Sequence, residues 1–138
     1  MFQNDYILRE IENLARFLTK VLHSERDDTS GLFDEFGNVT ETGLLSHRLR
    51  SLILESRVNE AENLLFEQFG RNPNRAYLDA AVKFYSELGK MTDKALERAE
   101  FSRQEIADGL SEIKEMFLRH NPVDTDGDNG DNDDMKGG

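Results

Sequence analysis

The chain has 138 residues and a formal net charge of −11 at neutral pH, with 33% charged and 37% apolar residues. This length fits one domain with a buried core. The acidic balance disfavours binding to nucleic acids and to anionic membranes, because both need a concentrated basic face. The absence of cysteine excludes disulfides, thiolate metal sites and cysteine nucleophiles.

The N-terminal segment predicts a long amphipathic helix from about Asn4 to Ser24 or Arg26. Its apolar residues alternate at spacings of four and three, which is a heptad-type seam. Additional apolar side chains widen this face, so the helix should pack on more than one neighbour, including the same helix of a second copy. We therefore expect the protein to self-associate through this helix. Four seam positions should form the contact: Ile7, Ile11, Leu14 and Leu18.

Nothing at the N-terminus indicates export or membrane insertion. The opening MFQNDYILRE contains Asp5 and Glu10 and lacks a basic segment followed by an apolar one, so it does not read as a secretory signal. No apolar run approaches the roughly 18 residues of a membrane span. We therefore predict a cytoplasmic protein that is not associated with membranes.

Turn-forming residues dominate the segment 27–43, where DDTSG and FGN interrupt the helical pattern. Leu32, Phe33, Phe36 and Val39 are interspersed among them, so this is not a bare linker. The expectation is a long loop, ordered or partly mobile, with apolar anchors docked on the helices.

Apolar periodicity predicts four further helices before the last one, over residues 41–55, 58–69, 74–88 and 91–99, with a break at residues 56–57. The apolar face of the first of these consists of Leu45, Leu49, Leu52 and Ile53. Gly70 and Gly89 stand where glycines commonly terminate helices in a left-handed conformation.

The last predicted helix has the clearest start signal. Ser102 and Glu105 have the spacing of a capping box, and Phe101 with Ile106 matches the accompanying hydrophobic staple. Gly109 lies inside the helix, where it costs up to about 1 kcal/mol relative to alanine, so we expect it to permit a close approach between two helices. The helix should end before Pro122, giving a single helical domain over residues 1–122.

Positions 33 residues apart match in character: Leu45 with Leu78, Leu49 with Val82, and Leu52 with Tyr85. A helical hairpin repeated near this period is typical of tetratricopeptide-like stacking. The expected fold class is therefore all-α, with antiparallel hairpins in a tetratricopeptide-like stack of about six helices and a long N-terminal helix. A generic helical bundle is the alternative, because only two degenerate copies are visible.

Three segments carry a wider resemblance: MFQNDYILREIENL, VNEAENLLFEQF and FSRQEIADGL. Together they resemble an uncharacterised family of bacterial all-helical, tetratricopeptide-like proteins, over roughly residues 1–117. The family has no established activity, so the resemblance implies a helical fold and no functional residues.

The acidic segment 123–138 is predicted to be a disordered tail. Asp124, Asp126 and Asp128 match positions 1, 3 and 5 of a calcium loop and are weak candidate metal ligands. The glycine and glutamate that such a loop needs at positions 6 and 12 are replaced by Asn129 and Met135. Cation binding by the tail is therefore the least favoured function.

No catalytic residue or cofactor is predicted. The three histidines are not spaced as helical metal ligands, and phosphate-binding or hydrolase motifs are missing. Aromatic residues between Phe66 and Tyr85 are expected in the core, or alternatively lining a groove for a peptide.

The sequence thus favours a protein-interaction or scaffold module with an unidentified protein partner. The alternative is an enzyme or small-ligand binder with an interhelical pocket, lined by His47, Arg48 or Tyr77.

Overall fold

The computed structural model describes residues 2–23 and 40–121, and within these ranges it contains six α-helices and no strand. Their bounds are α1 Phe2–His23, α2 Glu41–Leu54, α3 Val58–Arg71, α4 Arg75–Gly89, α5 Asp93–Arg98 and α6 Arg103–His120. The all-α fold class predicted from the sequence is confirmed. None of these helices is long and apolar enough to cross a membrane.

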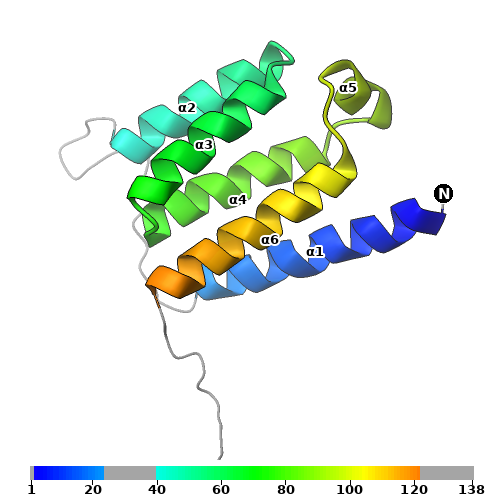
Figure 1. Ribbon diagram of the computed structural model, residues 1–138. Coiled ribbons are helices and arrows are strands. Elements are labelled where there is room, and N and C mark those ends of the chain that lie inside the picture. The colour runs from blue at the N-terminus through cyan, green and yellow to red at the C-terminus, as the bar shows by residue number, and fades with distance from the viewer. Residues whose placement is uncertain (1, 24–39, 122–138) are drawn as a thin grey trace, which may run out of the picture.

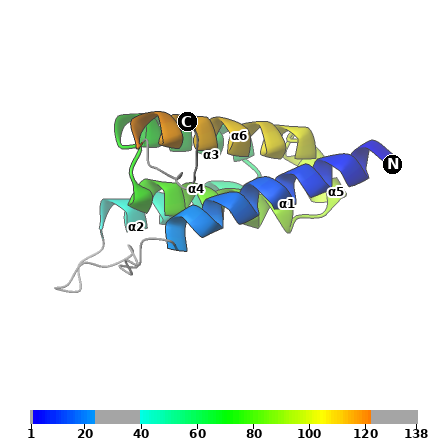
Figure 2. The ribbon, with the colours of Figure 1, turned by 90° about the horizontal axis from the view of Figure 1, so that it is seen from below.

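The five long helices lie in two layers (Figures 1 and 2). One layer has the order α2, α4, α1, and the other consists of α3 and α6. Helices α1, α3 and α6 run in one direction and α2 and α4 in the other, so the first and last helices are parallel neighbours (Figure 1). Helix α4 contacts all four other long helices and forms the centre of the fold.

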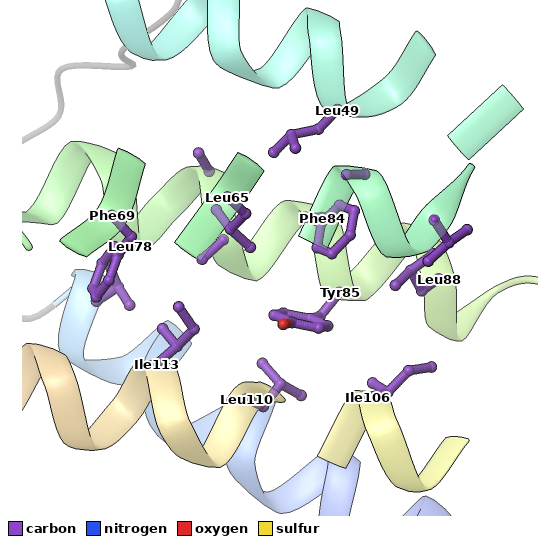
Figure 3. Close-up of a cluster of buried hydrophobic side chains, with 14 of the residues drawn as sticks. Leu49, Leu65, Phe69, Leu78, Phe84, Tyr85, Leu88, Ile106, Leu110 and Ile113 are labelled. Atoms are coloured by element: carbon purple, nitrogen blue, oxygen red, sulfur yellow. The ribbon is translucent and has the colours of Figure 1, made fainter. Parts of the chain in front are cut away.

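The core lies between the two layers, around α4. Figure 3 shows Leu78, Phe84, Tyr85 and Leu88 of α4 facing the apolar residues of the neighbouring helices. The rings of Phe84 and Tyr85 meet edge to face, with centroids 4.9 Å apart. The buried partners include Leu49 of α2, Leu65 and Phe69 of α3, and Ile106, Leu110 and Ile113 of α6.

Two side chains tie distant segments together where α4 begins. Arg75 Nη2 donates to the carbonyl oxygens of Val21 at 2.6 Å and Leu22 at 3.2 Å, at the end of α1. Asn121 Nδ2, just after α6, donates to the carbonyl of Pro73 at 2.8 Å. Because the last carbonyls of a helix have no partner within it, the Arg75 contact caps α1 with a charged donor.

Arg103 joins separate segments at the opposite end of the molecule. Its Nη2 donates to the carbonyl of Met91 at 2.7 Å, and its Nε donates to Asp93 Oδ1 at 2.9 Å. The Arg103 side chain is only 15% exposed. The short α5 and the turn before it are thereby anchored to the start of α6.

Most predicted helix positions agree with the structure to within one or two residues. The capping box of Ser102 and Glu105 is formed as predicted. The apolar face predicted for α2 is also confirmed, with Leu45 and Leu49 buried and Leu52 and Ile53 packed against the core. Helix α2 begins at Glu41, so residues 41–43 are helical rather than part of a loop. Thr40 caps the start of α2, while residues 27–39 of the predicted loop, and the tail, lie outside the described residues.

The predicted roles of Gly70 and Gly89 as left-handed helix terminators are wrong. Gly70 lies inside α3 and Gly89 is the last residue of α4. The left-handed positions are occupied by Ser56 and Glu100, at φ values of 61° and 59°. The amide of Arg57 bonds to the carbonyl of Leu52 at 2.8 Å, which closes α2 in the manner of a Schellman motif. Glu100 occupies the equivalent position after α5.

Replacing Ser56 or Glu100 with glycine should therefore stabilise the protein. The left-handed conformation has a steric free-energy cost for any residue with a Cβ, and glycine removes most of that cost. We expect each substitution to raise the free energy of unfolding by about 1 kcal/mol, measured by urea denaturation. Ser56→Ala, which retains the Cβ, is the control. A destabilised Ser56→Gly variant would contradict this interpretation.

Candidate functional site

The seam predicted for self-association on α1 is largely occupied within the chain itself. Leu18 is fully buried, and Ile11 and Leu14 are half-buried against the core. Ile7 is half-buried nearer the N-terminus. The seam therefore serves first to pack α1 on α6 and α4.

The N-terminal end of α1 extends beyond the start of α6, as both ribbon views show (Figures 1 and 2). The side chains of Tyr6 and Leu8 lie in this part of the helix and are 70% and 44% exposed. Large apolar side chains with this exposure can contact a second protein without disturbing the core. This end of α1 is one candidate interaction surface.

One flank of α1 bears a shallow, open depression. Among the described residues it is lined by Glu12, Ala15, Arg16, Thr19, Lys20 and His23. Arg16 and Glu12 form an exposed ion pair at 3.1 Å, one helical turn apart. Such a surface pair contributes little to stability, and the depression is too open to enclose a small ligand.

The outward face of α2 is the second candidate surface. Leu44 and Leu54 stand at its two ends and are 56% and 78% exposed. His47, Arg48 and Arg50 lie between them and are exposed. None of these three side chains has a hydrogen-bond or ion-pair partner among the described residues. The outward face of α2 thus combines exposed leucines with unpaired positive charge.

A polar pair is built into the contact between α3, α4 and α6. Tyr85 Oη of α4 donates a 2.6 Å hydrogen bond to Glu62 Oε2 of α3. Gly109 of α6 leaves the space for it, because a Cβ there would overlap the Tyr85 hydroxyl and lie 2.8 Å from Glu62 Oε2. The space at Gly109 is thus occupied by the side chains of Tyr85 and Glu62, and not by the closely approaching helix that the sequence predicted.

The electrostatics of this pair disfavour charge on Glu62. Partial burial raises the pKa of the Glu62 carboxyl, the Tyr85 hydrogen bond opposes that shift, and nearby carboxylates raise it further. The carboxylates are Glu105, Asp108 and Glu112 of α6. Burial, together with the Glu62 charge, also raises the pKa of the Tyr85 hydroxyl. The raised pKa keeps the Tyr85 hydroxyl protonated at neutral pH, where it donates to Glu62 and links α4 to α3.

Gly109→Ala should destabilise the protein. The new methyl group would displace the Tyr85–Glu62 pair, and overpacking of this kind costs about 1–3 kcal/mol. Gly89→Ala is the matched control, because nothing lies within 4 Å of a Cβ at that position. The control should be neutral or stabilising by up to about 1 kcal/mol. Equal effects in the two variants, measured by urea denaturation, would contradict the packing role of Gly109.

Glu62→Gln should change how stability depends on pH. Because the folded pKa of Glu62 is raised, the folded state binds more protons than the unfolded state above the unfolded pKa, whose ordinary value is 4.5. Wild-type stability should therefore fall, relative to Glu62→Gln, as pH rises from 4.5 through the folded pKa. Urea denaturation across a pH series measures this difference. A difference that stays constant with pH would rule out the assigned shift.

The remaining sequence candidates are not brought together by the structure. His47 and Arg48 are exposed on α2, whereas Tyr77 is buried on α4 and its hydroxyl donates to Glu41 Oε1 at 3.3 Å. Tyr85 is also buried, as expected for a core residue. The candidate metal ligands Asp124, Asp126 and Asp128 lie outside the described residues. Within residues 2–23 and 40–121, no three His, Cys, Asp or Glu side chains form a group that could hold a metal ion.

Comparison with known protein families gives a match over most of the chain. Residues 1–118 match the model of a family described as "Family of unknown function (DUF6483)". The chain belongs to this family. The match spans the segments in which the sequence resembles an uncharacterised helical family. Searches of curated proteins and of solved structures find no match to this member of DUF6483.

Proposed function

We propose that this DUF6483 protein is a protein-interaction or scaffold module. One observation supports the proposal: the exposed large hydrophobic side chains of the described residues are Tyr6, Leu8, Leu44 and Leu54. All four belong to α1 and α2, the two outer helices of the three-helix layer (Figures 1 and 2). The apolar surface thus lies at both edges of the layer, where a further protein can pack beside it.

The helix arrangement supports a tetratricopeptide-like stack as part of this proposal. Consecutive long helices from α2 to α6 alternate in direction and in layer, as stacked helical hairpins do (Figures 1 and 2). The 33-residue offset in the sequence pairs Leu49 of α2 with Val82 of α4 in the same layer. We propose that the family is bacterial and that the protein acts in the cytoplasm on protein partners.

For α1 we propose self-association as a two-fold dimer. Ile7, Ile11 and Leu14 are half-buried, so a partner helix can cover their remaining exposed area together with Tyr6 and Leu8. Leu18 differs from them, because it is already completely enclosed by its own chain. Its contribution is to folding, whereas the N-terminal half of α1 makes the contact between copies.

The double variant Tyr6→Ser, Leu8→Ser should convert the dimer to a folded monomer. Both side chains are exposed, so their removal weakens the association with little effect on the core. Sedimentation equilibrium over a range of concentrations measures the mass, and circular dichroism checks the fold. Leu18→Ala, the matched control, should lower the free energy of unfolding by about 2–5 kcal/mol while the folded fraction remains dimeric.

Two results would overturn the self-association proposal. One is a wild-type protein that remains monomeric at high concentration. The other is a Tyr6→Ser, Leu8→Ser variant that keeps the wild-type mass. The broader scaffold proposal would fail if the full chain also showed no saturable binding to any peptide or protein probe.

A further inference from the structure

The outward face of α2 has the residue spacing of one strand of a coiled coil. Leu44, His47, Ser51 and Leu54 are separated by three, four and three residues, which is the spacing of successive a and d positions. Arg48 and Arg50 then fall at the flanking e and g positions. The opposite side of α2, which includes Leu45 and Leu49, packs into the core, so the outward stripe is a second and independent face.

The charges on this face select the kind of partner. Arg48 and Arg50 have no ion-pair partner among the described residues, although the chain as a whole carries a net charge of −11. Nearby carboxylates are engaged elsewhere: Glu55 pairs with Arg57 at 2.8 Å, and Glu41 accepts the Tyr77 hydroxyl. Acidic residues at the e and g positions of a partner helix could form ion pairs with these two guanidinium groups, while its apolar residues contact the exposed leucines.

A second copy of α2 is a poor occupant for this face. Antiparallel pairing of two α2 helices brings e beside e and g beside g, which places Arg48 beside Arg48 and Arg50 beside Arg50. Parallel pairing brings each g residue beside the e residue of the following heptad, so Arg50 would face Glu55, which follows the end of α2 and is already paired with Arg57. Antiparallel pairing therefore opposes like charges, and parallel pairing offers Arg48 only Gly43, so neither arrangement satisfies both guanidinium groups.

We propose that the outward face of α2 is a docking site for an acidic amphipathic helix of a different protein. The partner helix presents apolar residues at a and d to Leu44 and Leu54, and carboxylates at e and g to Arg48 and Arg50. His47 and Ser51, polar at core positions of the pair, restrict the register. The site is about 21 Å long, since α2 has 14 residues and an α-helix rises about 1.5 Å per residue. The inference rests on the proposed interaction function and gives it a specific surface and partner chemistry.

The test uses the full chain and a fluorescein-labelled peptide of about three heptads, with leucine at a and d and glutamate at e and g. The peptide is first shown to be monomeric at the concentration used. Its charge-reversed twin has lysine in place of glutamate. Fluorescence anisotropy measures the affinity of each peptide for three proteins. These are the wild type, the double variant Arg48→Glu, Arg50→Glu and the double variant Leu44→Ser, Leu54→Ser.

The matched control is Lys94→Glu, Arg98→Glu, which makes the same change of charge on exposed residues of α5. Circular dichroism and urea denaturation confirm that each variant is folded. The glutamate peptide should bind wild type and control about tenfold more tightly than the lysine peptide, and the preference should reverse in Arg48→Glu, Arg50→Glu. The double variant Leu44→Ser, Leu54→Ser should bind neither the glutamate peptide nor the lysine peptide.

Three outcomes would overturn the proposal. The first is equal binding of the glutamate peptide to wild type and to Arg48→Glu, Arg50→Glu. The second is binding that requires removal of residues 124–138, which would make the acidic tail the occupant of the face. The third is a wild-type dimer that Leu44→Ser, Leu54→Ser converts to a monomer, which would make a second copy the occupant. A dimer that depends on Tyr6 and Leu8, without binding of the glutamate peptide, would leave the scaffold function standing and defeat only this inference.

Discussion

Burial of the apolar surface of α4 is the constraint on which the rest of the structure depends. This helix contacts α1, α2, α3 and α6, and the side chains from Tyr77 to Leu88 supply a large share of the buried core. A helix with so broad an apolar surface must be covered on several sides. Two layers with α4 at the centre meet that requirement, and they leave α1 and α2 at the edges with one face each in solvent.

The sequence predicted the helices well because each has a strong local signal. Alternating three- and four-residue spacing marked the core faces, and the capping box at Ser102 fixed the start of α6. The helix ends were harder, since the left-handed positions went to Ser56 and Glu100 rather than to Gly70 and Gly89. A glycine permits that conformation without requiring it, and the packing of the following residue decides where a helix stops.

The candidate surfaces were less accessible to sequence analysis. The seam on α1 was identified, but one sequence cannot tell which seam residues pack within the chain, as Leu18 does, and which remain for a partner. The stripe on the outward side of α2 contains only two leucines. The core face of the same helix is more apolar and therefore gives the stronger sequence signal. The Tyr85–Glu62 hydrogen bond joins residues 23 positions apart in different helices, and only the unusual glycine at position 109 pointed toward it.

The placement of α1 beside α6 has a consequence for how the protein is made. Of the described helices, α1 is synthesised before the α6 helix against which it packs, so its apolar stripe has no α6 to cover it until nearly the whole domain has been made. Contacts between the two ends of a chain form slowly, because a long loop must close first. The stripe therefore stays uncovered by α6 through most of the synthesis of the domain, a period in which exposed apolar surface favours aggregation.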